Sequence, residues 1–167
     1  MRKMSDITLL PLTGSDGSEV IDIFNYYVRT SFGAFPEKPV PDEFFDRMMQ
    51  AARGYPAVAA RDRDGVLAGF GMLRPHNPLP AFAHTAEVTY FVRSDMTSRG
   101  IGTAMLRHLE ADGKKRGISL ILAHISSRNE GSLRFHERHG FSEVGRFHGA
   151  GKKQGLFFDS VWMEKSL

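Results

Sequence analysis

The sequence contains no cysteine, and this absence excludes several kinds of chemistry at once. A chain without thiols has no disulfides, no thiolate metal sites and no cysteine nucleophile. A lack of cysteine is also typical of proteins from the cytoplasm, where disulfides are rare. We therefore expect a cytoplasmic protein.

The sequence also lacks the long apolar stretches that membrane proteins need. No segment approaches the roughly 20 apolar residues that cross a bilayer, so no membrane association is predicted. The start, "MRKMSDITLL", is basic but has no apolar h-region or cleavage site, and no export signal is predicted. The chain has 167 residues, 41% of them hydrophobic, without repeats or linker-like stretches. These properties predict one domain over residues 1–167.

Positive charge is in small excess and is not concentrated anywhere. The net charge is +3, and the basic residues are scattered rather than gathered in a stripe. No nucleic-acid partner is therefore predicted. The short clusters "KKRG" (114–117) and "GKK" (151–153) are compatible with a small phosphorylated ligand or with an ordinary solvated surface.

Hydrophobic periodicity predicts alternating strands and helices. The predicted strands cover residues 7–12, the two arms of a hairpin within 55–74, and residues 84–93, 118–125, 142–150 and 156–165. The predicted helices cover residues 18–30, 41–53, 99–112 and 129–141. Asp64 and Gly65 mark the hairpin turn, and Gly140 is expected to end the last helix. The strand–helix–strand run over residues 84–125 predicts a parallel strand pair within a mixed α/β sheet.

Two glycines stand at the start of the predicted helix 99–112, in "TSRGIGTAMLRHLE" (97–110). Gly100 and Gly102 have no Cβ atoms to obstruct an anion that approaches the unpaired N–H groups of a helix start. This pattern predicts an anion site, with a pyrophosphate as its ligand; a tight strand–helix turn is the alternative. A dinucleotide fingerprint does not fit because residue 105 is Met, and no G-K-[ST] string makes a P-loop.

The wider pattern resembles the GCN5-related N-acetyltransferase superfamily, whose motif is [QR]-x-x-G-x-[GA]. The similar segments are "EVTYFVRSDMTSRGIGTAMLRHLE" and "GISLILAHISSRNEGSLRFHERHGF", with Thr97 where the motif has Gln or Arg. "NEGSLRFHERHGFSEVG" and "GKKQGLFFDSVWMEKSL" resemble the phosphinothricin and methionine-sulfone acetyltransferase subfamily. The resemblance covers nearly the whole chain. It implies a mostly antiparallel α/β sheet, with one parallel strand pair splayed at the acetyl-CoA site and helices on both faces.

The resemblance also implies acetyl-CoA as the co-substrate, without a metal. Backbone N–H groups are implied to bind its pyrophosphate, from Ser98, Arg99, Gly100, Ile101, Gly102 and Thr103. The backbone of Tyr90, Phe91 and Val92 is implied to pair with the pantetheine arm, and an N–H there to polarise the thioester carbonyl. Asn129 is implied to contact the same arm, and Arg138 to lie near the phosphates.

Acetylation of an amine requires a base, because an ammonium group is not a nucleophile. The resemblance implies Glu87 as this base, directly or through water; a solvent-facing or Arg-paired glutamate is the alternative. His136 stands where the superfamily usually has Tyr. It is predicted to protonate the departing thiolate or donate a hydrogen bond to it, with a surface histidine as the alternative. His136 and His139 have no clear third ligand, so no metal site is predicted.

Phe35, Phe82 and Thr89 are predicted to bind the substrate. Phe82 and Ala83 replace a Tyr and an Arg that the subfamily often has, and Ala34 replaces an Asn. The loss of a cation and a hydroxyl is expected to weaken binding of a carboxylate or oxo group.

These observations predict an N-acetyltransferase that acts in a ternary complex. Its substrate is expected to be the primary amine of a small amino-acid-like compound, of the phosphinothricin or methionine sulfone/sulfoximine type. The resemblance implies a homodimer. Two other functions are considered: a protein or peptide N-acetyltransferase, and an acetyl-CoA-binding protein with little turnover.

Overall fold

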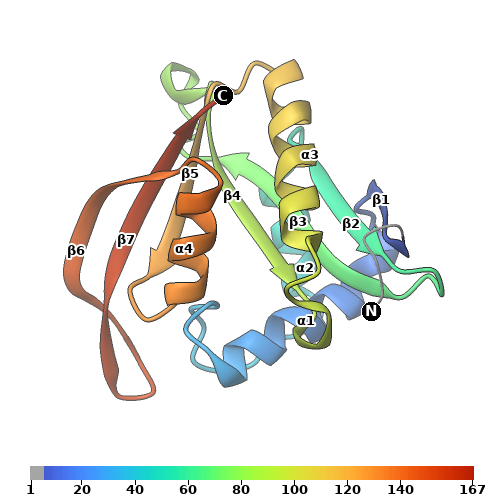
Figure 1. Cartoon of the computed structure of the whole chain (residues 1–167), viewed down its shortest axis with the longest axis horizontal. Helices are drawn as coiled ribbons and strands as arrows, with labels where there is room; N and C mark the ends of the chain where they lie inside the picture. The colour runs from blue at the N-terminus through green and yellow to red at the C-terminus, as the bar shows by residue number, and fades with distance from the viewer. Residues whose placement is uncertain (1–5) are drawn as a thin grey trace.

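A seven-stranded sheet runs through the computed structural model, which describes residues 6–167 (Figure 1). In spatial order its strands are β1 (Thr8–Pro11), β2 (Ala57–Arg61), β3 (Leu67–Pro75), β4 (Thr85–Val92), β5 (Leu120–Ser126), β7 (Leu156–Ser166) and β6 (Ser142–Lys153). Neighbouring strands are antiparallel except β4 and β5, which are parallel. The mixed, mostly antiparallel sheet that we predicted is thus confirmed.

The parallel strands β4 and β5 pair only near their beginnings. Residues 85–87 of β4 pair with residues 120–122 of β5, whereas β4 continues to Val92 and β5 to Ser126. Beyond Glu87 the two strands diverge (Figure 1). This confirms the splayed pair and leaves backbone groups on the facing strand edges without a sheet partner.

Two helices cover each face of the sheet (Figure 1). Helices α1 (Gly17–Thr30) and α2 (Phe44–Ala51) pack on one face, and α3 (Ile101–Lys115) and α4 (Glu130–Arg138) on the other. Short 3₁₀ turns are η2 (Gly14–Asp16), η3 (Pro80–Phe82) and η4 (Ser94–Met96). None of the helices between residues 6 and 167 has the length and apolar character that crossing a bilayer would require.

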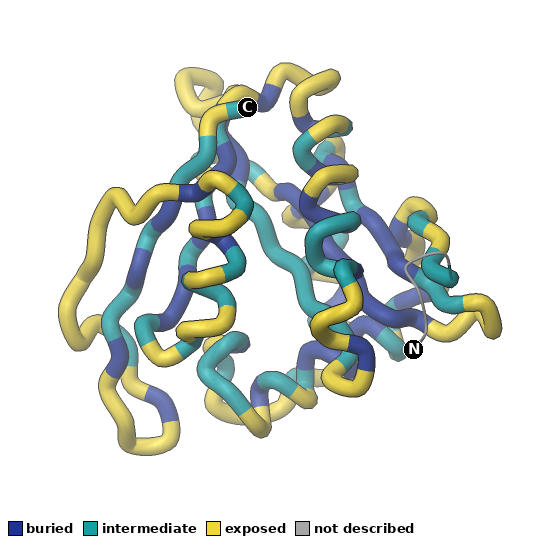
Figure 2. Tube along the Cα trace, in the orientation of Figure 1, coloured by how far each residue is buried: buried dark blue, intermediate teal, exposed yellow. Residues whose placement is uncertain are grey.

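The buried residues lie along the central strands and the inner helix faces (Figure 2). In α3, Ile101, Met105 and Leu109 recur at i, i+4 and are at most 2% exposed. The same spacing buries Val20 and Phe24 of α1 against the opposite face. Each fully buried apolar side chain contributes on the order of 1.5–3 kcal/mol, so these stripes fix the helices on the sheet.

Several predicted element boundaries are corrected by backbone conformation. Helix α3 begins at Ile101 rather than at residue 99, because Ser98 and Gly100 have φ values of 60° and 80°, which no right-handed helix contains. Helix α2 is shorter than predicted at both ends, and β6 extends three residues further, to Lys153. Gly140, with φ of 88°, follows α4 as the predicted helix stop.

Candidate active site

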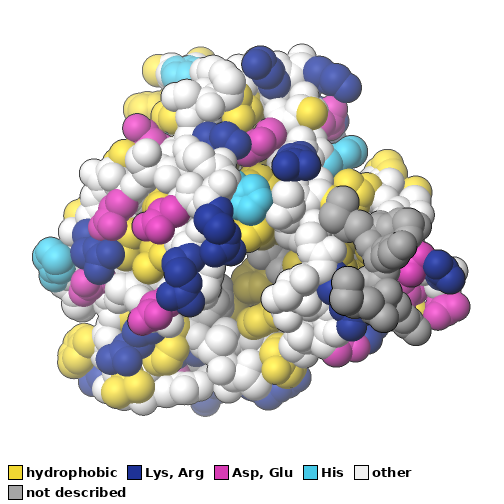
Figure 3. All heavy atoms as spheres, in the orientation of Figure 1, with side chains coloured by type: hydrophobic (Ala, Val, Ile, Leu, Met, Phe, Trp, Pro, Cys, Tyr) yellow, Lys and Arg dark blue, Asp and Glu magenta, His cyan; other side chains and the backbone are white. Residues whose placement is uncertain are grey.

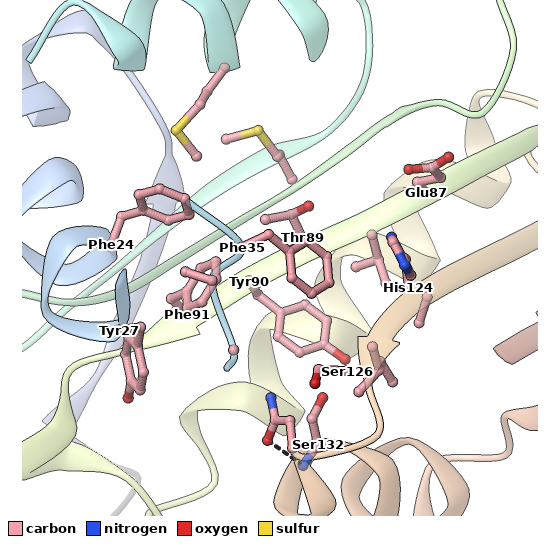
Figure 4. Close-up of a pocket in the computed structure, with 18 of the residues that line it drawn as sticks. Phe24, Tyr27, Phe35, Glu87, Thr89, Tyr90, Phe91, His124, Ser126 and Ser132 are labelled. Atoms are coloured by element: carbon pink, nitrogen blue, oxygen red, sulfur yellow. Dashed lines mark hydrogen bonds between the residues drawn. The ribbon is translucent and has the colours of Figure 1, made fainter. Parts of the chain in front are cut away.

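A cavity of about 660 Å³ lies where β4 and β5 diverge (Figure 4). Residues 87–92 of β4 and 123–126 of β5 line it, together with parts of α1, α2, α4 and the loop after α1. On the face that carries α3 and α4, the surface is hollowed between these two helices, and Lys and Arg side chains gather over α4 (Figure 3). The splayed sheet therefore opens into a site that elements from both of its faces surround.

The start of α3 is open towards this cavity. Gly100 is the N-cap, and the backbone N–H groups of the first turn have no partner within the helix. A Cβ atom on Gly102 would lie 3.5 Å from the Phe135 ring, an ordinary contact distance, so packing within the protein does not require glycine there. Because Gly102 lines the cavity, its missing side chain leaves room for a ligand at the helix start. This end of the cavity suits an anion such as a pyrophosphate.

The remaining residues of this predicted loop have varied surroundings. Ile101 is buried in the core, and the Arg99 guanidinium donates to the backbone oxygen of Asp95 at 3.1 Å. The Thr103 hydroxyl and His139 Nε2 are in hydrogen-bond contact at 2.9 Å, and His139 Nδ1 donates to the Phe135 carbonyl of α4. Thr103 thus links α3 to α4, and a role in ligand binding would fall to its backbone N–H.

The predicted pantetheine residues lie along the splayed part of β4. Tyr90, Phe91 and Val92 line the cavity, where β4 has β3 on one edge and no strand on the other. The Tyr27 hydroxyl of α1 donates to the Val92 carbonyl at 2.5 Å. An extended ligand that carries amides would find unpaired backbone groups along this edge. These residues therefore fit the pantetheine arm of acetyl-CoA.

Of the two other residues predicted to contact acetyl-CoA, Asn129 lines the cavity and Arg138 does not. The Asn129 Oδ1 accepts from the Ser132 backbone N–H at 3.2 Å and so caps α4. Arg138 is exposed in the last turn of α4 and lies outside the cavity lining.

Glu87 lies in the cavity wall with both carboxylate oxygens occupied. Arg74 Nη2 donates to its Oε2 at 2.6 Å, and His76 Nδ1 lies 3.0 Å from its Oε1. The Glu87 side chain is only 13% exposed. The sequence analysis considered a pair with an arginine but did not name Arg74, which lies opposite Glu87 in the β3–β4 register. Glu87 is therefore paired with an arginine, which was one of the alternatives considered from the sequence, and it belongs to a charged cluster.

His136 is a buried residue of α4 with both ring nitrogens engaged. Its Nδ1 donates to the Ser132 carbonyl at 2.7 Å, so its Nε2 accepts from the Tyr90 hydroxyl at 2.5 Å. Burial lowers the pKa of His136 to about 4, and burial raises the pKa of the Tyr90 hydroxyl. A neutral imidazole without a proton on Nε2 does not fit the predicted acid. His136 instead orients the Tyr90 hydroxyl, which points towards Ser126 and Ser132 (Figure 4).

His124 of β5 also lines the cavity and was not predicted. Its ring stacks on Trp162 with centroids 4.4 Å apart and lies 4.8 Å from the Phe35 ring. Its Nε2 lies 2.6 Å from Ser160 Oγ. Burial lowers the pKa of His124. In the sequence, this residue is a single polar position within an apolar strand, which carries no functional signal by itself.

Of the predicted substrate residues, Phe35 and Thr89 line the cavity and Phe82 does not. Phe82 is 40% exposed in η3, with its ring centroid 6.3 Å from that of His76. The cavity also has an apolar part that the sequence did not indicate, formed by Phe24, Phe44, Met48, Met72 and Phe91. Among residues 6–167, no group of three or more His, Asp or Glu side chains is arranged to hold a metal ion.

Comparison with known proteins identifies the chain. The sequence model described as "Acetyltransferase (GNAT) family" matches residues 20–141. The chain belongs to the GNAT acetyltransferase family. It is an acetyl-CoA-dependent N-acetyltransferase, and the subfamily that we inferred from the sequence is also confirmed.

The relatives of this GNAT chain align over almost its full length. Phosphinothricin N-acetyltransferase of Streptomyces viridochromogenes is 30% identical over 162 residues, which cover 96% of this chain and 88% of that protein. L-methionine sulfoximine/L-methionine sulfone acetyltransferase of Pseudomonas paraeruginosa is 29% identical over 89% of this chain and 87% of that protein. A phosphinothricin acetyltransferase from Sinorhizobium meliloti, solved in complex with AcCoA, has the same fold, with a TM-score of 0.91. It is 24% identical and covers 97% of this chain and 89% of its own.

Proposed function

We propose that this GNAT enzyme transfers acetyl from acetyl-CoA to the primary amine of a small amino-acid-like compound. The observation that carries the proposal is the ion pair of Arg74 and Glu87 in the wall of a largely apolar cavity. An amino acid carries a carboxylate and an ammonium group, and these would complement Arg74 and Glu87 respectively. A substrate of the phosphinothricin or methionine sulfone/sulfoximine type is in keeping with the relatives' names.

For acetyl-CoA we propose a path from the start of α3 to the splay of the sheet. The backbone N–H groups of residues 98–103 bind the pyrophosphate, and the edge of β4 at residues 90–92 pairs with the pantetheine arm. Asn129 contacts the same arm, and Arg138 contributes positive charge beside the hollow. A β4 N–H group that faces the thioester carbonyl would stabilise the oxyanion of direct attack. The acetyl donor itself supplies an activated carbonyl carbon with a thiolate leaving group.

For the proton transfers we propose roles that follow from the hydrogen bonds. Glu87 attracts the substrate ammonium, since its charge lies in the cavity wall while Arg74 and His76 hold it in place. On the other side, His136 accepts a hydrogen bond from the Tyr90 hydroxyl and so holds it beside the place where the thiolate departs. Phe35 and Thr89 contribute contacts to the substrate, and Phe82 acts indirectly, next to His76.

We also propose that the enzyme is a homodimer in the cytoplasm. Large apolar side chains are exposed on β6 and β7, among them Phe147 and Phe157, which are 64% and 61% exposed. Exposed apolar patches of this kind are typical of contact surfaces. The absence of cysteine is in keeping with a reducing compartment.

The experiment that tests the proposed function measures CoA thiol release from acetyl-CoA with a panel of amines. The panel contains free amino acids, methionine sulfone and sulfoximine, phosphinothricin, polyamines and short peptides. We expect turnover with an amino-acid-like amine. Turnover restricted to peptides would favour a protein or peptide acetyltransferase instead, and acetyl-CoA binding without thiol release would favour a non-catalytic binding protein.

A further inference from the structure

His124 lies in the part of β5 that has separated from β4. It lies two residues beyond the last paired residue of β5, Leu122, whose partner is Glu87 of β4. The Glu87 and His124 side chains both line the cavity, and the charge of Glu87 acts on the His124 ring (Figure 4). This is the part of the cavity in which a substrate ammonium drawn to Glu87 would lie.

The contacts of His124 hold the ring in one orientation and leave one nitrogen available. Trp162 stacks on one side of the ring, with the planes 3° apart, and Phe35 packs against it at a tilt of 46°. Nε2 is in hydrogen-bond contact with Ser160 Oγ. Within residues 6–167, Nδ1 makes no hydrogen bond. If Nε2 carries the ring proton and donates it to Ser160, Nδ1 presents an unprotonated lone pair.

Every basic atom of the other candidates already has a partner within the protein. Both oxygens of Glu87 are already in contact with Arg74 and His76, at 2.6 and 3.0 Å. Both nitrogens of His136 are in hydrogen bonds within the protein. His124 is thus the candidate whose second ring nitrogen has no hydrogen-bond partner among residues 6–167.

We propose that His124 is the catalytic base, and that its Nδ1 takes the proton from the substrate ammonium beside Glu87. This assignment rests on the proposed amine acetyltransferase function. It gives Glu87 and His124 separate tasks, since one attracts the ammonium and the other removes its proton.

The proton and bond changes balance without a further reactant. One N–H bond of the ammonium breaks and Nδ1–H forms, which leaves a neutral amine. The amine nitrogen then bonds to the thioester carbonyl carbon, and the C–S bond breaks. A second proton leaves the nitrogen and ends on the sulfur as CoA thiol, and the imidazolium returns its proton to solvent.

The surroundings of His124 are compatible with a role as the catalytic base. Burial favours the neutral ring and lowers the pKa of His124, so the residue is ready to accept a proton at neutral pH. The negative charge of Glu87 opposes that shift, whereas the charge of Arg74 adds to it. From β7, the neutral groups Ser160 and Trp162 face the ring.

Trp162 fluorescence can report the protonation of His124, because Trp162 stacks on this ring and is the sole tryptophan of the chain. Contact with a protonated imidazole quenches indole fluorescence. We expect the emission of Trp162 to fall as the pH is lowered from 8 to 5, with a midpoint below 6.5 and with unchanged circular dichroism. His124→Gln should abolish the transition. His76→Asn is the matched control, because His76 lies 6.2 Å from the same indole and its loss should leave the transition in place.

The deciding experiment is the pH dependence of kcat/KM with an amine that the wild type acetylates. We expect His124→Gln to lower kcat/KM at pH 7 by about 10²-fold or more. The kcat/KM of this variant should rise steadily up to pH 9, because the fraction of free amine increases. The wild type should level off above the pKa of the base. Glu87→Gln should instead raise KM for the amine more than it lowers kcat.

The outcomes separate the two proposals. If the wild type acetylates no amine, the proposed function fails and the assignment of His124 fails with it. If the wild type is active and His124→Gln stays within about threefold of it with the same pH profile, only the assignment of His124 is overturned. Unchanged acetyl-CoA affinity of His124→Gln, measured by calorimetry, verifies that the variant is folded.

Discussion

Two histidines line the same cavity with different hydrogen-bond partners. His136 has both nitrogens engaged, by the Ser132 carbonyl and the Tyr90 hydroxyl, whereas only one nitrogen of His124 has a hydrogen-bond partner among residues 6–167. Burial lowers the pKa of both rings. At the scale of single residues, hydrogen-bond geometry therefore distinguishes a positioning residue from a candidate base.

The low pKa of His136 makes a contribution to stability that depends on pH. In the unfolded chain the pKa is about 6.5, and in the folded protein it is about 4, so the unfolded state binds more protons between these values. The contribution is fully present above pH 6.5 and is lost as the pH falls towards 4. Between pH 7 and pH 5 the wild type should lose about 2 kcal/mol more unfolding free energy than His136→Gln. Urea unfolding at both pH values measures this difference, and equal losses in the two proteins would contradict it.

A side chain at Gly102 should have opposite effects on protein stability and on acetyl-CoA binding. Since its Cβ would make only an ordinary contact with Phe135, Gly102→Ala should stabilise the free protein by up to about 1 kcal/mol. The same methyl group would narrow the approach to the helix start and should weaken acetyl-CoA binding several-fold. Thermal unfolding and calorimetric titration measure the two effects.

A control for the effect on affinity is Gly113→Ala, which is in the same helix and outside the cavity lining. Its Cβ would lie 2.9 Å from Leu73 Cδ1, so this variant should be less stable than the wild type. It should leave acetyl-CoA affinity unchanged. An affinity of Gly102→Ala equal to that of the wild type would remove the start of α3 from the proposed binding path.

At the scale of elements, the hairpin of β6 and β7 braces the cavity wall. Lys153 of β6 is 1% exposed, and its Nζ donates to the Ser31 and Ala34 carbonyls at 2.7 and 2.6 Å. The loop after α1 carries these carbonyls and also Phe35, which stacks on Phe158 of β7. Two elements far apart in the sequence thus form one side of the substrate pocket.

Replacing this buried lysine should loosen the wall. Lys153→Met leaves two carbonyls without their donor, and we expect a loss of about 1–3 kcal/mol for such a change. Hydrogen exchange should also become faster in residues 31–37. Lys152→Met is the matched control, because the neighbouring Lys152 is exposed and its Nζ lies over the Phe157 ring. Equal stability of the two variants would contradict the bracing role of Lys153.

At the scale of the whole molecule, the proposed homodimer depends on exposed apolar surface. Phe147→Lys on the edge strand β6 should shift the protein from dimer to monomer, since a buried unpaired charge is costly. Sedimentation velocity measures this shift. Leu79→Lys serves as the control, because Leu79 is similarly exposed, at 60%, but lies in the loop before η3. A wild type that sediments as a monomer would refute the dimer.

The fold was predictable from the sequence to a large extent, because its signals are local. Apolar residues at i, i+4 in α3, the turn at Asp64 and Gly65, and Gly140 after α4 act within a few residues of the chain. Element order then fixed the parallel pair, since a strand–helix–strand crossover leaves no other arrangement. The start of α3 was misjudged by two residues because the φ values of Ser98 and Gly100 are not visible in a propensity pattern.

The site was predicted less completely, for a physical reason. Gly102, Asn129 and Thr89 were found because local motifs and the family resemblance mark them, and all three line the cavity. By itself, the sequence determined the elements, the family and the glycine-rich start of α3, which depend on neighbours along the chain. Only the tertiary structure decided that Arg74 occupies Glu87 and that Trp162 stacks on His124, because sheet register brings together side chains that are distant in sequence.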